Sequence, residues 1–304
     1  MHFPFLVSVN QPEEKIPGKK FKEYTNMAFL TFNFESRYLN GNTEIGMILP
    51  ECSRRMEAAE FYRPGKKYRV LWLLHGGRGD YSDWIRKSMI EVYACEHDLV
   101  VIMPSAMNSA YTDWPSFSVG YDMYGFFLKE LMKMVYSWFP VSDRREDNYI
   151  AGLSMGGWGA GKFAVNNPEL FAGAAILSST VRNYDFMFEE KSPEVCLQYG
   201  NLIRNSGGLE AFHESLDYCT RGILQKTVEE GKKKNLPKLF IGYGDEDHHR
   251  EEFEDFVDFC RKIKLPFELK IYSGYGHEWR MWDLGIQDAL SFFGFGMLEH
   301  REIN

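Results

Sequence analysis

The ten residues Asn148-Tyr-Ile-Ala-Gly-Leu-Ser-Met-Gly-Gly157 determine how the rest of the chain is organised. Residues 149–153 form an apolar run with the length of one buried strand, and residues 158–165 are suited to a helix. A strand, a Gly-x-Ser-x-Gly turn and a helix in this order are the context of a nucleophile elbow. The two glycines of the motif leave room for a sharp turn. We therefore expect Ser154 to stand exposed above the sheet in a strained backbone conformation.

Other apolar runs along the chain predict further strands of the same sheet. Runs that are apolar almost throughout are typical of parallel strands buried on both faces. Segments with helical spacing lie between them, which predicts one doubly wound, mostly parallel α/β sheet with helices on both faces, the α/β-hydrolase fold. The expected strands are residues 27–38, 43–49, 69–74, 99–103, 149–153, 171–177, 238–243 and 267–272, and the expected helices are residues 83–97, 124–138, 158–165, 253–263 and 282–293.

The pattern also predicts how the chain is divided. Residues 1–26 are charged and rich in structure-breaking residues, which indicates a loosely held N-terminal extension. Residues 27–304 are expected to form a single domain that opens with a hairpin across the turn Asn40-Gly41-Asn42. Residues 181–235 show only weak periodicity. Because they lie between the elbow and the late strands, we expect a lid or a pocket-lining insertion there.

Composition excludes several classes of partner and cofactor. The formal net charge of −8 argues against nucleic acid and anionic membrane surfaces as partners. No run approaches 18 apolar residues, and the N-terminus has neither the basic start nor the long apolar core of a signal peptide. The five cysteines are widely spaced and odd in number, which predicts neither a disulfide framework nor a metal site. Free buried thiols in a reducing cytoplasm are the expectation.

A nucleophilic serine needs a base to remove its proton and an acid to orient that base. On this type of sheet the acid and then the histidine follow the late strands. His277 comes after the last expected strand and a glycine-rich loop, whereas Asp245 and Asp247 come after the strand before it. His277 is therefore the predicted base. The spacing alone leaves both aspartates open as the acid.

Acyl transfer also needs hydrogen-bond donors for the oxyanion. One donor is expected to be the backbone N–H of Met155, which follows the nucleophile, and the other to come from the loop after an early strand. That loop contains Gly76 and Gly77, whose missing side chains allow close approach of the backbone, and Gly77 is the preferred donor. Tyr111 and Trp114 follow another strand and are candidate pocket walls, with simple packing as the alternative.

Several of these stretches together resemble the tributyrin esterases, which belong to the esterase D-like esterases. That group also includes S-formylglutathione hydrolases, feruloyl and acetyl-xylan esterases and mycolyltransferases. The resemblance covers about residues 27–293 and implies an α/β-hydrolase fold, a serine acyl-enzyme and no cofactor or metal. The stretches that carry it are Leu73-Leu-His-Gly76, Asp83-Trp84, Val100-Val-Ile-Met-Pro104, Ala151-Gly-Leu-Ser-Met-Gly-Gly157 and His277-Glu-Trp279-x-x-Trp282.

The acid motif departs from the family pattern. The family usually has Cys-Gly-x-x-Asp-Phe-Leu, whereas this chain has Tyr243-Gly-Asp-Glu-Asp247-His-His249. Placing Tyr243 at the family's cysteine assigns the acid to Asp247 rather than Asp245. His248 and His249 are expected to be the solvated start of a helix. Residues 1–26 have no counterpart in the family pattern.

The resemblance implies a cytoplasmic serine carboxylesterase that acts on small-molecule esters. Ser154, His277 and Asp247 would form the catalytic triad. The aromatic residues Trp114, Trp279 and Trp282 are expected to narrow the pocket and favour short acyl chains, with Gly76 also beside the substrate. Hydrolysis of acetylated or feruloylated sugars, hydrolysis of S-formylglutathione, acyl transfer to an alcohol and a non-catalytic binding role are the alternatives. The sequence leaves the oligomeric state open, including a homo-oligomer.

Overall fold

The computed structural model describes residues 26–54, 56–184 and 200–296, so the expected N-terminal extension lies outside it except for its last residue. Eight strands form one sheet in the order β1-β2-β4-β3-β7-β8-β9-β10. They confirm the predicted strands, with ends shifted by no more than two residues. The strands are β1 Asn26–Ser36, β2 Gly41–Glu51, β3 Arg69–Leu74, β4 Leu99–Pro104, β7 Asn148–Leu153, β8 Gly173–Leu177, β9 Lys238–Gly244 and β10 Glu268–Tyr272.

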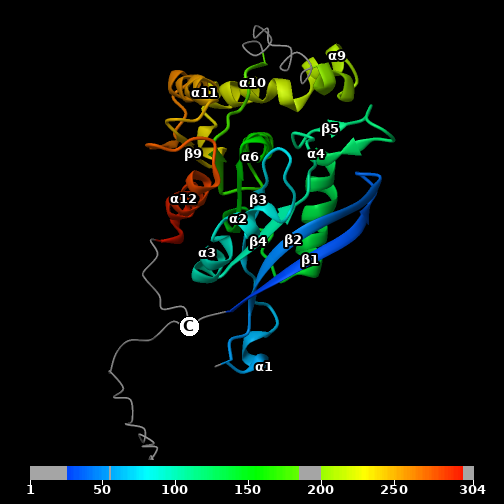
Figure 1. Cartoon of the computed structure of the whole chain (residues 1–304), viewed down its shortest axis with the longest axis vertical. Helices are drawn as coiled ribbons and strands as arrows, with labels where there is room; N and C mark the ends of the chain where they lie inside the picture. The colour runs from blue at the N-terminus through cyan, green and yellow to red at the C-terminus, as the bar shows by residue number, and fades with distance from the viewer. Residues whose placement is uncertain (1–25, 55, 185–199, 297–304) are drawn as a thin grey trace, which may run out of the picture.

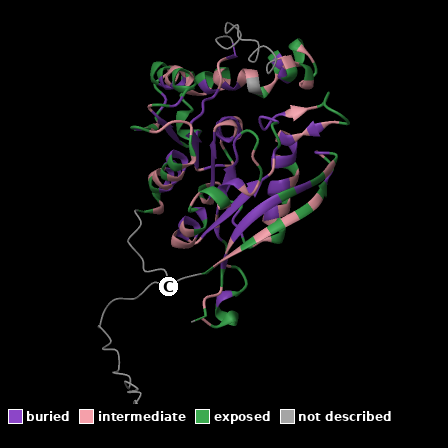
Figure 2. Cartoon of the chain, viewed as in Figure 1, coloured by how far each residue is buried: buried purple, intermediate pink, exposed green. Residues whose placement is uncertain are grey.

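The sheet is mostly parallel, as the apolar runs predict. β1 and β2 form an antiparallel hairpin, and β2 is antiparallel to β4, whereas all later neighbours run parallel. Every residue of β4, β7 and β8 is buried (Figure 2). Strands of this kind are covered on both faces. The edge strand β1 instead alternates between exposed and half-buried residues.

Helices cover both faces of the sheet (Figure 1). Alternate strand residues point to opposite faces: Leu73 belongs to the core cluster on the side of α3 and α12, and Trp72 to the cluster on the side of α5, α6 and α11. The helices are α1 Ala58–Phe61, α2 Asp83–Lys87, α3 Ile90–His97, α4 Met123–Gly125, α5 Met132–Trp138, α6 Met155–Asn166, α9 Leu209–Glu214, α10 Leu216–Glu229, α11 Arg250–Lys262 and α12 Trp279–Leu290. Short 3-10 turns span Arg145–Asp147 and Lys233–Asn235, and π-helical turns span Phe126–Leu131 and Ser291–Phe295.

The helix expected at residues 83–97 is wrong as one element, because α2 and α3 are separated at Ser88. Ser88 is extended, with φ −139° and ψ 176°. Its hydroxyl donates to the carbonyl of Trp84 (2.6 Å) and accepts from the backbone N–H of Ile90 (3.3 Å). The side chain therefore satisfies the end of one helix and the start of the next, and such local bonds compete with a continuous helix.

Two connections between the main strands contain short elements that the sequence pattern did not predict. The short strands β5 Asp113–Trp114 and β6 Tyr121–Asp122 pair antiparallel, and residues 121–122 directly precede α4. The described part of residues 181–235 contains α9 and α10, which lie across the top of Figure 1, where α10 packs on α6. Within the described ranges, no helix has the length and apolar character needed to cross a membrane.

The cysteines are less buried than expected. Cys260 is buried, but Cys52, Cys95 and Cys219 are half-buried, and all four are free thiols. Cys196 lies outside the described residues.

Candidate active site

Ser154 occupies the sharp turn between β7 and α6. Its backbone has φ 51° and ψ −120°, a conformation that side-chain-bearing residues rarely adopt. A Cβ on Gly152 would collide with the backbone of Gly156, and a Cβ on Gly156 would collide with the backbone of Leu74. The two glycines are therefore required for the turn. Ser154 itself is half-buried, so its side chain is partly accessible, as the motif predicts.

Asp247 and His277 form a close pair at the ends of β9 and β10. Oδ2 of Asp247 lies 2.8 Å from Nδ1 of His277, and Oδ1 accepts a hydrogen bond from the backbone N–H of His249 (3.0 Å). The carboxylate is fully enclosed, whereas 18% of the His277 side chain is exposed. Burial by itself would raise the pKa of Asp247, but the hydrogen bonds from His277 and from the backbone N–H of His249 hold the pKa below its usual value. Asp247 is therefore ionised beside the imidazole.

Asp245 has a different environment. Its Oδ1 accepts the backbone N–H of Gly274 (2.7 Å), and this bond, followed by one from Ser273, lowers the pKa of the Asp245 carboxyl. It therefore ties the loop after β9 to the loop after β10. The structure brings Asp247 to His277 and leaves Asp245 in the turn role that aspartates commonly have.

Backbone hydrogen bonds continue between the strands beyond their ends and fix these turns relative to one another. Each of the three bonds joins the start of one loop to the end of the next strand in the sheet. They are Ser154 N–H to Leu177 O (2.8 Å), Ser178 N–H to Gly242 O (2.7 Å) and Asp245 N–H to Tyr272 O (3.1 Å). The turns that carry Ser154, Asp247 and His277 are therefore connected in series through β8, β9 and β10.

The loop after β3 is the candidate oxyanion loop. Gly76 is buried and Gly77 is exposed. A Cβ on Gly76 would lie 2.5 Å from Cδ1 of Leu153 and 3.5 Å from Cβ of Ser154, so this loop passes directly beside Ser154. Among the described residues, neither the N–H of Gly77 nor that of Met155 donates to a protein acceptor. Both donors are therefore available to a ligand.

His75 holds this loop in place, a role that the sequence reasoning missed. Its Nε2 accepts the backbone N–H of Ala106 (2.9 Å), which leaves the proton on Nδ1 to donate to the carbonyl of Gly76 (2.6 Å). Burial lowers the pKa of His75, outweighing the bond to Gly76, so the ring is kept neutral. The Leu-Leu-His-Gly sequence was the available signal, but only the structure shows that His75 accepts from Ala106 and donates to Gly76.

The candidate pocket residues separate into two groups. Tyr111 is fully buried and donates its hydroxyl to the carbonyl of His75 (3.1 Å), so it packs beneath the oxyanion loop and is not an open wall. Trp114 and Trp279 are half-buried. The ring of Trp279 lies 5.2 Å from that of Trp282, which in turn stands edge-on to His277 at 5.0 Å. Trp282 therefore limits the movement of the imidazole.

Two further histidines lie against the pair formed by Asp247 and His277. The rings of His248 and His249 are 5.2 and 5.6 Å from the ring of His277. A hydrogen bond to Glu252 (3.2 Å) raises the pKa of His249, whereas burial and the neighbouring imidazoles lower the pKa of His248. His249 does precede α11 and both side chains are substantially exposed, but their contact with His277 was not anticipated.

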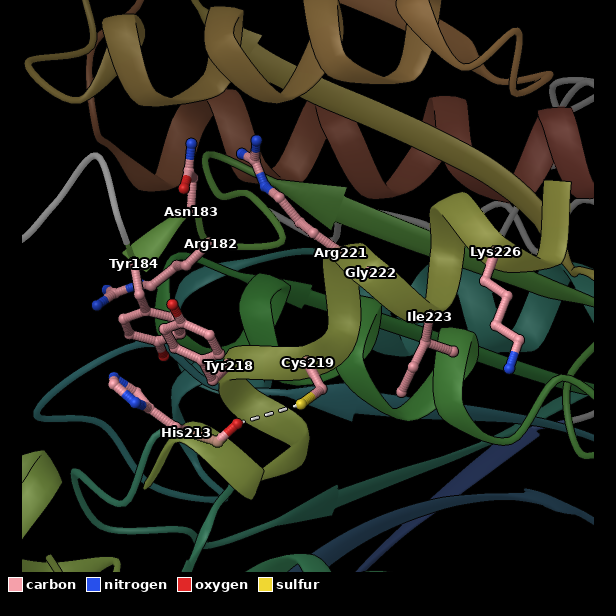
Figure 3. Close-up of a pocket in the computed structure, with 10 residues that line it drawn as sticks. All are labelled: Arg182, Asn183, Tyr184, His213, Tyr218, Cys219, Arg221, Gly222, Ile223 and Lys226. Atoms are coloured by element: carbon pink, nitrogen blue, oxygen red, sulfur yellow. Dashed lines mark hydrogen bonds between the residues drawn. The ribbon is translucent and has the colours of Figure 1, made fainter. Parts of the chain in front are cut away.

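A cavity of about 450 Å³ lies between the loop after β8 and the helices α9 and α10 (Figure 3). Ser154, Asp247 and His277 are not among the residues that line it. Its lining residues are Arg182, Asn183, Tyr184, His213, Tyr218, Cys219, Arg221, Gly222, Ile223 and Lys226. Within the described residues, no cluster of three or more His, Cys, Asp or Glu side chains is arranged to hold a metal ion.

Comparisons with known proteins agree on one family and fold. A family model described as "Putative esterase" matches residues 36–293. An acetyl esterase of Caldicellulosiruptor saccharolyticus is 28% identical over 277 residues, which are 88% of this chain and 98% of that protein.

Two solved structures from Staphylococcus aureus are also similar. FphF, a fluorophosphonate-binding serine hydrolase with substrate bound, is 30% identical with a TM-score of 0.73, covering 88% of this chain and 98% of that one. The S-formylglutathione hydrolase FrmB is 31% identical with a TM-score of 0.71, covering 88% of this chain and 99% of that one. The sheet described above is therefore an α/β-hydrolase fold.

Proposed function

The chain belongs to this esterase family and is a serine ester hydrolase, and we propose that it cleaves short-chain acyl esters of small molecules through an acyl-enzyme on Ser154. The observation that carries the assignment of roles is the 2.8 Å contact between the enclosed Asp247 carboxylate and Nδ1 of His277. It fixes the imidazole with Nε2 unprotonated, which is the form that a general base requires.

The proposed reaction has two half-reactions. Oγ of Ser154 attacks the ester carbonyl while His277 takes the hydroxyl proton, and the N–H groups of Met155 and Gly77 stabilise the oxyanion. His277 then gives its proton to the leaving alkoxide, and the alcohol departs. Water attacks the acyl-enzyme with His277 again as the base, which releases the carboxylic acid and restores the serine. Asp247 stays ionised throughout and stabilises the imidazolium.

The tryptophans near the base support a short acyl group. Trp282 lies against His277 and Trp279 lies against Trp282, so large rings occupy one side of the reacting centre. We propose small-molecule esters such as tributyrin and acetyl esters as substrates, and a cytoplasmic location on the basis of the free thiols. Residues 27–304 form one catalytic domain in this proposal, with α9 and α10 as the pocket-lining insertion.

The related enzymes favour a second group of substrates within the same chemistry. Solved relatives include an S-formylglutathione hydrolase and feruloyl esterases, the latter below 25% identity. Rates on p-nitrophenyl esters of rising chain length, measured beside acetyl-xylan, methyl ferulate and S-formylglutathione, distinguish these substrates. Adding a competing alcohol and measuring the new ester distinguishes acyl transfer from hydrolysis.

Labelling with a fluorophosphonate tests the nucleophile directly. The wild-type chain should be labelled at one serine, and Ser154→Ala should not be labelled. Labelling of the folded Ser154→Ala protein at wild-type rate would contradict the proposed nucleophile.

A further inference from the structure

The loop that follows β4 contacts the loop that carries Gly77. Ala106 and Tyr111, on either side of Asn108, both bond to His75, through Nε2 (2.9 Å) and the carbonyl (3.1 Å). Non-glycine residues with positive φ also flank Asn108: Met107 (49°), Ala110 (56°) and Tyr111 (54°). Strain of this kind persists only where surrounding contacts impose the conformation. The loop therefore holds Asn108 in a defined position.

The side chain of Asn108 stands over the open side of Gly77. Its Oδ1 accepts the backbone N–H of Arg78 at 2.6 Å. The same oxygen is the nearest heavy atom to the free face of Gly77, 3.7 Å from where a Cβ would lie. Because a backbone N–H only donates, the atom facing Arg78 must be the amide oxygen, and this fixes the orientation of the amide group.

The other end of the amide is available for a ligand. Asn108 is exposed, and its NH₂ group donates to no acceptor within the described part of the chain. A side-chain NH₂ whose carbonyl is anchored is already oriented and loses little entropy when it binds. A Cβ on the neighbouring Gly76 would lie 3.5 Å from Cβ of Ser154, so the loop that the Asn108 amide contacts at Gly77 passes beside Ser154.

We propose that Asn108 is a further catalytic residue, whose NH₂ group donates a hydrogen bond to the oxyanion beside the N–H groups of Gly77 and Met155. Its Oδ1 also fixes the peptide between Gly77 and Arg78, which directly follows the peptide that carries the Gly77 donor. This inference rests on the proposed function. No other residue of the chain combines an anchored amide with the open face of the oxyanion loop in the described structure.

The test uses the charge of an isosteric substitution. Asn108→Asp keeps an oxygen for the N–H of Arg78 but replaces the NH₂ donor with a carboxylate, which repels a developing oxyanion. Asn108→Ala removes both groups. With p-nitrophenyl acetate, we expect kcat of Asn108→Ala to fall about 10²-fold with little change in KM, as for other lost oxyanion donors. The kcat of Asn108→Asp should be lower than that of Asn108→Ala.

Three measurements complete the test. Asn40→Ala is the matched control, because it also removes side-chain hydrogen bonds between loops, to Val119 (3.1 Å) and Gly120 (3.0 Å), and it should keep wild-type kcat. Melting temperatures establish that the variants are folded, and Asn108→Ser takes the place of Asn108→Ala if the latter does not fold. Ser154→Ala tests the proposed function separately.

Two results would overturn the inference. If kcat of Asn108→Asp equals or exceeds kcat of Asn108→Ala, the side chain only holds Arg78 in place and does not contact the oxyanion. If kcat of Asn108→Ala stays within about threefold of wild type, the Asn108 side chain neither contacts the oxyanion nor positions the loop for catalysis. An active Ser154→Ala protein would instead overturn the proposed function, whatever the Asn108 variants do.

Discussion

Replacing Asp247 by Asn is the most informative single change at the triad. Asn preserves the size of the side chain but removes its charge. If the Asn NH₂ group faces Nδ1 of His277, it donates to that nitrogen and stabilises the tautomer with the proton on Nε2, which cannot accept the proton of Ser154. The change therefore removes both the correct tautomer and the stabilisation of the imidazolium.

The structure sets the size of the effect. The carboxylate has no exposed surface, so solvent screens the pair weakly, and the charges of Asp247 and a protonated His277 lie roughly 4 Å apart. At an effective dielectric constant of about 20 this attraction is worth about 4 kcal/mol, or about 10³ in rate. The wrong tautomer adds to this loss. The same Asp-to-Asn change of the triad acid in a serine protease lowers kcat about 10⁴-fold. We expect kcat to decrease by 10³- to 10⁴-fold on this scale.

Asp245→Asn is the matched control. Its side chain is near the surface and accepts from Gly274, so the expected loss of kcat is less than about tenfold. Both variants would be assayed with p-nitrophenyl acetate after active-site titration, and their melting temperatures compared with wild type. A larger loss for Asp245→Asn, or a folded Asp247→Asn protein with more than a tenth of wild-type kcat, would refute the assignment of the acid.

Three other predictions use the same preparation. Ser154→Ala should fold normally and lose roughly 10⁴- to 10⁶-fold in kcat, and appreciable turnover would exclude the acyl-enzyme on this residue. Esters with C2 to C4 acyl chains should react faster than a C12 ester, because the Trp279 and Trp282 rings occupy the space beside the base; the opposite order would contradict that pocket. Burial lowers the pKa of His75 in the folded state, so its contribution to stability is present above the ordinary pKa of 6.5 and is lost as the pH falls below it. Below pH 6.5 the free energy of unfolding of the wild-type protein should therefore decrease by up to about 1.4 kcal/mol per pH unit relative to His75→Asn. If thermal unfolding gives both proteins the same dependence of stability on pH, His75 is not buried in its neutral form.

The sequence predicted those parts of the molecule whose structure depends on local pattern. The buried strands follow from apolar runs, and the turn at Ser154 follows from two glycines that no other residue can replace. The choice of Asp247 over Asp245 did not follow from spacing, since both lie three residues after a glycine. It needed the register of the family pattern, and the contact with His277 agrees with that register.

Features that depend on distant contacts could not be predicted in this way. Tyr111 looked like a pocket wall because it follows a strand end, but its hydroxyl reaches the carbonyl of His75 and the residue is buried. His248 looked like a solvated helix start, and its exposure is high, but the fold also brings its ring against His277. The deciding neighbour lies 36 residues away along the chain for Tyr111 and 29 residues away for His248.

The strained residues show how the fold positions the site. Ser154 and Ser178 both have positive φ, and each directly follows a fully buried strand. Each also donates its N–H to the next strand, Ser154 to Leu177 and Ser178 to Gly242. Positive φ at a residue other than glycine costs about 1–3 kcal/mol, and it persists only if the surrounding structure imposes it. Here the hydrogen bonds between strands continue past β7 and β8, so the rigid centre of the sheet imposes the strain. The backbone of the sheet thus holds Ser154, the proposed nucleophile, in its strained conformation, and it holds the loop after β8 in the same way.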